Sequence, residues 1–159
     1  MIKYYPLELS NLMFEAISDS EAKKKAKEQY CYYPEDSEHV MLNKNTDGLV
    51  NYAIFFSSVG FSVTRCIGAP INPADTDTIK KSESTDTFLF PWSFVSSMQI
   101  AKYRNRSGLR INFKDKELNP ISLEVKDDAF QYIMLHNIKH LFYEYLNSVI
   151  PHTPSGDFY

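Results

Sequence analysis

The chain has 159 residues, of which 43% are apolar and 14% aromatic, enough to bury the core of one globular domain. Its formal net charge of −3 argues against a protein built mainly to bind nucleic acid. We expect no signal peptide and no membrane span, because the start lacks an apolar core and no run of about 18 apolar residues occurs. Cys31 and Cys66 fit no zinc-ligand spacing, so we expect reduced thiols in a cytoplasmic protein.

Residues 1–34 are predicted to form an N-terminal helical extension. Apolar residues recur there at helical spacing: Leu9, Leu12, Met13 and Ile17. Ser18 and Glu21 fit a capping box that opens a second helix, which Pro34 ends. The lysines of this second helix fit a solvated face, with a docking surface for an acidic partner as the alternative.

From residue 38 onwards the pattern changes from helical to strand-like. Short turns join most of the segments, which predicts an antiparallel sheet system. A long, mobile loop is predicted at 68–85, where prolines and polar residues gather. The predicted strands, about seven, are 39–42, 49–57, 60–66, 87–90, 94–103, 108–113 and 120–125.

A long amphipathic helix is predicted from Asp127 to Ile150, with Asp127 or Asp128 as its N-cap. Its apolar stripe is wide enough to cover the open end of a small barrel or sandwich. Residues 151–159 are predicted to be a flexible tail. The predicted stripe consists of Phe130, Met134, Ile138, Leu141, Phe142, Tyr145 and Val149.

The order of these elements resembles the pleckstrin-homology (PH) superfold, especially the bacterial PH-like domains. The segment Tyr52–Arg65 looks like the family's hairpin of an apolar strand, a turn and a glycine-aromatic strand. The segment Phe88–Val95 resembles the point where the family's chain passes between strands around a buried aromatic. The resemblance assigns 35–150 to a PH-like domain and implies an α+β fold of seven strands, in two near-orthogonal sheets capped by a C-terminal helix. It places Trp92 and Val95 in buried positions.

PH-like domains mostly bind phosphoinositides, peptides or proteins, and the fold alone does not decide which. The candidate contact surface is a basic hairpin, and arginine binds phosphate or carboxylate bidentately. Alternation predicts Lys102, Arg104 and Arg106 on one side, if the strand persists. The alternative is a solvated edge whose charges prevent aggregation. The predicted partner-binding residues are Lys102, Arg104, Arg106, Arg110 and Lys114, with Lys116 nearby.

The family's lipid-binding hairpin corresponds to Asn51–Arg65, which holds Arg65 and no lysine, so it does not favour phosphoinositide binding. His136, His140 and Glu144 rise along one side of the last helix, but that side is predicted to face solvent, so we predict no metal site.

No nucleotide loop, nucleophile motif or paired-histidine metal motif occurs, so no catalytic residue and no cofactor are predicted. We therefore expect a non-catalytic module that binds a protein or peptide, as a scaffold, adaptor or antagonist. Two alternatives stay open: a peripheral binder of anionic membrane lipids, and a small α+β enzyme with a pocket under the last helix.

Overall fold

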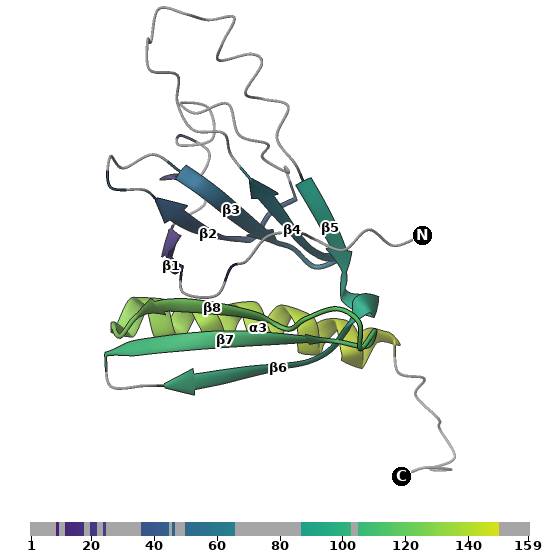
Figure 1. The fold of residues 1–159 in the computed structure, drawn as a ribbon. Coiled ribbons are helices and arrows are strands. Elements are labelled where there is room, and N and C mark those ends of the chain that lie inside the picture. Colours follow the sequence, from purple (N-terminus) through teal and green to yellow (C-terminus); the bar gives the residue numbers. More distant parts are fainter. Residues whose placement is uncertain are drawn as a thin grey trace, which may run out of the picture.

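The computed structural model describes residues 9, 12–17, 20, 21, 24, 36–44, 46, 50–65, 87–102 and 105–149. These residues form one curled mixed sheet and a C-terminal helix (Figure 1). The predicted long loop, the predicted tail and both cysteines lie outside the described residues.

Eight strands are formed by the described residues, rather than the seven predicted. Their order across the sheet is β5-β4-β3-β2-β1-β8-β7-β6. The strands are β1 (Met13–Ile17), β2 (His39–Lys44), β3 (Val50–Phe56), β4 (Gly60–Arg65), β5 (Thr87–Pro91), β6 (Val95–Lys102), β7 (Arg106–Phe113) and β8 (Ile121–Lys126). The 3-10 turn η1 (Trp92–Phe94) leads from β5, at one edge of the sheet, to β6 at the other.

β1 corrects the prediction of a helix in this region. Phe14 and Ala16 are buried while Met13 and Glu15 are exposed, which is the two-residue period of a strand. A segment of 5 residues fits either period, and the neighbours β2 and β8 decide between them by binding both of its edges. Of the second predicted helix, Ser20, Glu21 and Lys24 are helical, and the rest lies outside the described residues.

β1 also makes the sheet mixed rather than purely antiparallel. It pairs antiparallel with β2 and parallel with β8, where Met13 lies opposite Glu124 and Phe14 opposite Val125. Beyond Phe14, the side chain of Gln131 takes over from β8. Its Oε1 accepts from the Ala16 N–H at 2.8 Å, and its Nε2 donates to the Ala16 carbonyl at 3.1 Å. A helix side chain thereby completes the edge of β1.

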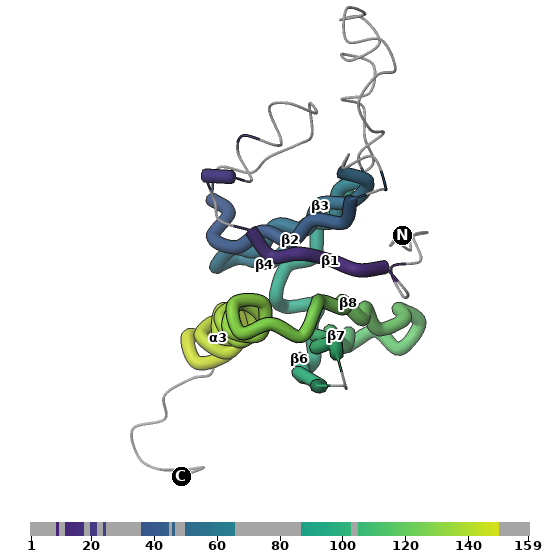
Figure 2. Tube along the Cα trace, turned by 90° about the vertical axis from the view of Figure 1, so that its left-hand side faces the viewer, coloured from purple at the N-terminus to yellow at the C-terminus, as the bar shows by residue number. Residues whose placement is uncertain are grey.

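The last helix is present as predicted and is α3 (Ala129–Val149). Asp128 caps it, because its Oδ1 accepts from the Gln131 N–H at 3.0 Å. Figure 2 shows α3 beside the sheet of β6, β7 and β8. Its buried stripe runs through Gln131, Leu135, Ile138, Leu141 and Phe142.

The predicted stripe of α3 is partly wrong. Ile138, Leu141 and Phe142 are buried, and Met134 and Tyr145 pack partly buried against the core. Phe130 and Val149 are each 51% exposed. The observed stripe begins at Gln131, one position after Phe130, and one residue corresponds to a rotation of about 100° around a helix.

An aromatic cluster joins the two halves of the sheet to α3. Trp92 is fully buried, as predicted, and its Nε1–H donates to the Ser57 carbonyl at 3.0 Å. Its ring lies 5.6 Å from Phe61 and 5.7 Å from Phe142, measured between centroids. Val95, the other residue that the resemblance placed inside, is also buried. The turn between the two edge strands is therefore part of the core.

The opposite face of β1, β2 and β3 carries a second buried cluster. It includes Ile17, Val40 and Phe55, and it is separate from the main core. Val40 lies opposite Ile17 on β1 and opposite Phe55 on β3, so the cluster crosses three strands. β2 and β3 are therefore buried on both faces. On β4 the same face carries the hydroxyl residues Ser62 and Thr64.

Candidate functional site

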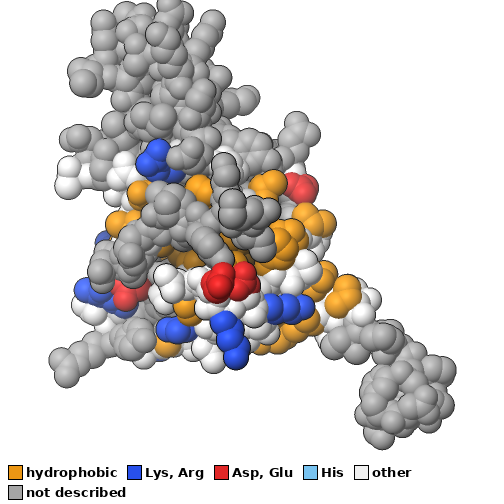
Figure 3. Space-filling view, turned by 45° about the vertical axis from the view of Figure 1, so that its right-hand side comes forward, with side chains coloured by type: hydrophobic (Ala, Val, Ile, Leu, Met, Phe, Trp, Pro, Cys, Tyr) orange, Lys and Arg blue, Asp and Glu red, His pale blue; other side chains and the backbone are white. Residues whose placement is uncertain are grey.

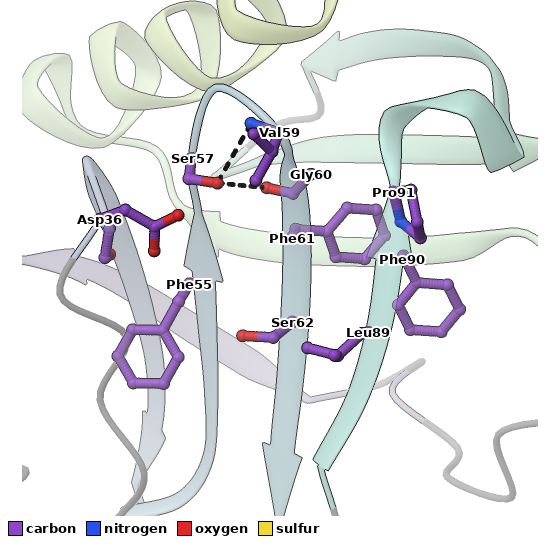
Figure 4. Close-up of a pocket in the computed structure, with 11 residues that line it drawn as sticks. Asp36, Phe55, Ser57, Val59, Gly60, Phe61, Ser62, Leu89, Phe90 and Pro91 are labelled. Carbon is purple, nitrogen blue, oxygen red and sulfur yellow. Dashed lines mark hydrogen bonds between the residues drawn. The ribbon is translucent and has the colours of Figure 1, made fainter.

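A pocket of about 350 Å³ opens on the outer face of β3, β4 and β5, and we call it the Ser62 pocket (Figure 4). Its floor follows one row of the sheet, in which Phe55 lies opposite Ser62 and Ser62 opposite Leu89. The lining residues are Asp36, Ser37, Phe55, Ser57, Val59, Gly60, Phe61, Ser62, Leu89, Phe90 and Pro91.

The β3–β4 turn builds one end of the Ser62 pocket. The Ser57 hydroxyl donates to the Gly60 carbonyl at 3.3 Å and accepts from the Val59 N–H at 3.2 Å. Gly60 has φ +155°, and a Cβ there would lie 2.3 Å from the Phe90 carbonyl oxygen. Only glycine allows the strands to approach so closely. Val59 projects from the turn with 66% of its surface exposed.

The floor of the pocket holds a hydroxyl without a partner. Ser62 is buried, and its Oγ makes no hydrogen bond in the structure. The next hydroxyl on this face of β4 belongs to Thr64, which lies 3.2 Å from the Thr87 hydroxyl. Buried polar groups normally have a partner. Ser62 is therefore an unfilled hydrogen-bonding position beside an apolar floor.

Asp36 is the one ionisable residue among the described residues that line the Ser62 pocket. It is exposed, and within the part of the chain that the structure describes it forms no ion pair. Figure 4 shows its carboxylate on the side of the pocket opposite Leu89. Leu89 is 67% exposed. The pocket thus has an acidic side and an aliphatic side.

His39 lies in β2, three residues after Asp36. Partial burial lowers the pKa of its imidazole from the ordinary value, and the nearby Glu38 carboxylate opposes this shift. His39 is therefore neutral over a wider pH range in the folded protein than in the unfolded chain.

The structure divides the predicted basic hairpin between two faces of the sheet. Lys102 pairs with the inward-facing Ser107, and its Nζ lies 5.4 Å from the centre of the Tyr132 ring on α3. Arg106 and Arg110 lie on the other face of β7, away from the buried Ser107. The alternation of side chains between the two faces is interrupted at the turn after Lys102. Lys102 and Arg106 therefore lie on different faces of the sheet.

Arg106 and Lys102 each have an acidic partner. Arg106 Nη1 lies 3.0 Å from Glu124 Oε2, and Lys102 Nζ lies 3.5 Å from Asp127 Oδ1. Arg110 Nε donates to Asn112 Oδ1 at 3.1 Å. Lys102 and Arg106 are therefore paired with carboxylates of the domain itself, and Arg110 is hydrogen-bonded to an amide.

The remaining predicted positions do not extend this surface. Lys114 and Lys116 are exposed on the loop between β7 and β8, and Arg104 lies outside the described residues. On the face shown in Figure 3, basic side chains are dispersed among acidic and uncharged ones. β7 also begins two residues before the predicted strand 108–113, because Arg106 and Ser107 already belong to it.

The histidines of α3 face solvent, as predicted. His136 and His140 are exposed, and His140 Nε2 lies 2.9 Å from Glu144 Oε1. Among the residues that the structure describes, no three His, Cys, Asp or Glu side chains are grouped to hold a metal ion. None of the described helices combines the length and apolar composition needed to cross a membrane.

Sequence reasoning missed the Ser62 pocket. The available signal was the alternation in β4, which places Ser62 and Thr64 on one face and Phe61 and Val63 on the other. This signal does not reveal a pocket by itself, because Asp36 and Leu89 come from other segments and reach Ser62 only through the sheet.

Comparison of the chain with protein-family models, curated protein sequences and solved structures finds no significant match. The architecture itself is α+β, with an 8-stranded curled sheet and one C-terminal helix among the described residues, and it is compatible with a PH-like half-barrel.

Proposed function

We propose that the protein is a non-catalytic, PH-like binding module that recognises a protein or peptide partner through the Ser62 pocket. The observation that carries this proposal is the chemistry of the pocket lining. Among the described residues it combines an apolar floor, exposed aliphatic side chains at Val59 and Leu89, and a single ionisable residue, Asp36. Such a surface is suited to recognition, because apolar anchors supply affinity and a few polar groups supply orientation.

The basic hairpin is the weaker candidate contact surface. Arg106 and Lys102 are engaged by Glu124 and Asp127 at 3.0 and 3.5 Å, and they lie on different faces. An acidic partner or an anionic lipid would have to compete with these internal carboxylates. This arrangement favours a partner held at the Ser62 pocket over one held by the basic hairpin.

Affinity selection of a random heptapeptide display library on the immobilised full-length chain tests the proposal. We expect enriched peptides whose binding, measured by isothermal titration calorimetry, falls about tenfold in Leu89→Asp, which places a charge on the apolar rim. Ile133→Asp is the matched control, because Ile133 is 57% exposed on α3 and outside the pocket lining. We expect it to leave binding unchanged.

Arg106→Glu/Arg110→Glu tests the basic surface in the same assay. We expect affinity within twofold of the wild type, since these side chains lie away from the Ser62 pocket. A library that yields no specific peptide would contradict the proposed function. Binding lost in the arginine variant but kept in Leu89→Asp would instead assign recognition to the basic hairpin.

A further inference from the structure

The Ser62 pocket has room for one large side chain. Its volume of about 350 Å³ lies near the lower end of the range of about 300–1,000 Å³ for small-molecule sites. Phe55 and Leu89 provide apolar surface on either side of Ser62. An aromatic side chain fills such a space with large contact area and little loss of conformational freedom.

The Ser62 hydroxyl favours a ligand side chain that also carries a polar group. Its Oγ is buried and has no hydrogen-bond partner, and Figure 4 shows it between Phe55 and Leu89. Leu89 is 67% exposed, so its side chain is free to change rotamer and admit a ligand atom. A phenolic hydroxyl can donate to or accept from Ser62. Among natural aromatic side chains, tyrosine therefore matches the floor best.

Asp36 sets the charge of the partner. None of the described residues that line the Ser62 pocket is basic, so a cationic side chain would meet the Asp36 carboxylate without competition from a lysine or arginine among them. Asp36 precedes β2, and Ser62 lies on β4, with β3 between them (Figure 4). At about 4.8 Å for each of the two strand spacings, Asp36 and Ser62 are about 10 Å apart.

An extended segment matches this separation when its two anchors are alternate residues. Side chains at positions i and i+2 point to the same side and start about 7 Å apart, and a lysine or arginine spans the remainder. We propose that the Ser62 pocket binds a tyrosine of an extended partner segment, while Asp36 binds a lysine or arginine two residues away. This inference rests on the proposed function and specifies its partner.

Four blocked pentapeptides test the inference on the full-length chain. The first carries tyrosine at its second position and arginine at its fourth, with glycine elsewhere. The second replaces tyrosine by phenylalanine, the third replaces arginine by glutamate, and the fourth moves arginine to the position next to tyrosine. Methyl chemical-shift titration at Val59 and Leu89 reports occupancy of the pocket directly.

We expect the first peptide to bind tightest. Loss of the phenolic hydroxyl should weaken binding about 3- to 10-fold, and glutamate or displaced arginine should weaken it about 2- to 5-fold, less at high salt. Ser62→Ala should remove the preference for tyrosine over phenylalanine, and Asp36→Asn the preference for arginine over glutamate. Ser107→Ala and Glu144→Gln, which change a buried hydroxyl and an exposed carboxylate elsewhere, should preserve both preferences.

The outcomes separate this inference from the proposed function. If library-selected peptides bind through Leu89 but the four pentapeptides show no preference, the tyrosine–cation inference is wrong and the binding function stands. Equal shifts with all four peptides in wild type and Asp36→Asn also overturn the inference. If neither library nor pentapeptides bind, both proposals fail.

Discussion

Gln131 and Ala16, 115 residues apart in the sequence, are joined by two buried hydrogen bonds between one side-chain amide and one backbone unit. The Gln131 amide makes the hydrogen bonds that a neighbouring strand would make, at a position of β1 where β8 is no longer paired with it. The first strand and the last helix are therefore fixed to each other by direction-specific contacts rather than by apolar packing alone.

Gln131→Leu should destabilise the protein by on the order of 3 kcal/mol, because the buried N–H and C=O of Ala16 would both lose their partner. Urea unfolding measures this change. Asn137→Ala, at an exposed position of α3, should stay within about 0.5 kcal/mol of the wild type. Equal stability of Gln131→Leu and wild type would show that these bonds contribute nothing net.

Gly60→Ala should cost on the order of 3 kcal/mol or prevent folding, because its Cβ would lie 2.3 Å from the Phe90 carbonyl oxygen at positive φ. Thermal unfolding followed by circular dichroism measures the loss. Gly108→Ala is the control, since its Cβ would meet the Leu123 carbonyl oxygen at 3.4 Å. Similar melting temperatures for the two variants would contradict the close approach at Gly60.

Ser62→Ala and Ser107→Ala should each stabilise the free protein by about 1 kcal/mol, because each removes a buried hydroxyl that has no hydrogen-bond partner. Denaturant unfolding of the single and double variants checks this, and the two effects should add. Thr64→Val is the contrasting change. It should not stabilise the protein, because it deletes the Thr64 hydroxyl contact with Thr87.

Lowering the pH below about 6.5 should reduce stability through His39. Burial lowers its folded-state pKa, so the unfolded chain binds the proton more readily and gains relative to the folded state as pH falls. His39→Gln should therefore lose less stability than the wild type between about pH 7 and pH 5. Unfolding curves in a pH series provide the comparison, and parallel pH profiles would exclude a contribution from His39.

The strands β2 to β8 and the helix α3 could be predicted from the sequence because their signals are local. Alternating apolar residues and the Asp128 cap act within a few neighbouring positions. β1 could not be assigned in this way. Its residues fit both periods, and pairing with β8 and Gln131, far along the chain, determines the outcome.

The candidate site was harder to predict because it depends on sheet register. The strand does not continue from Lys102 to Arg106. β6 ends at Lys102, which lies opposite Ser107, so its neighbour Arg106 lies on the other face. Asp36, Ser62 and Leu89 carry no mutual pattern in the sequence. They meet because β2, which follows Asp36, and the strands β3, β4 and β5 are successive neighbours in the sheet.

The position of β1 has a consequence for synthesis on the ribosome. Of the strands that the structure describes, β1 is synthesised first, but one of its neighbours, β8, ends at Lys126, and Gln131 follows later still. Until then, the nascent domain holds β1 through β2 alone among the strands that flank it in the finished sheet. Among the described elements, the strand made first is thus completed only by the strand and helix made last, so we expect its pairing with β8 and Gln131 to form late in folding.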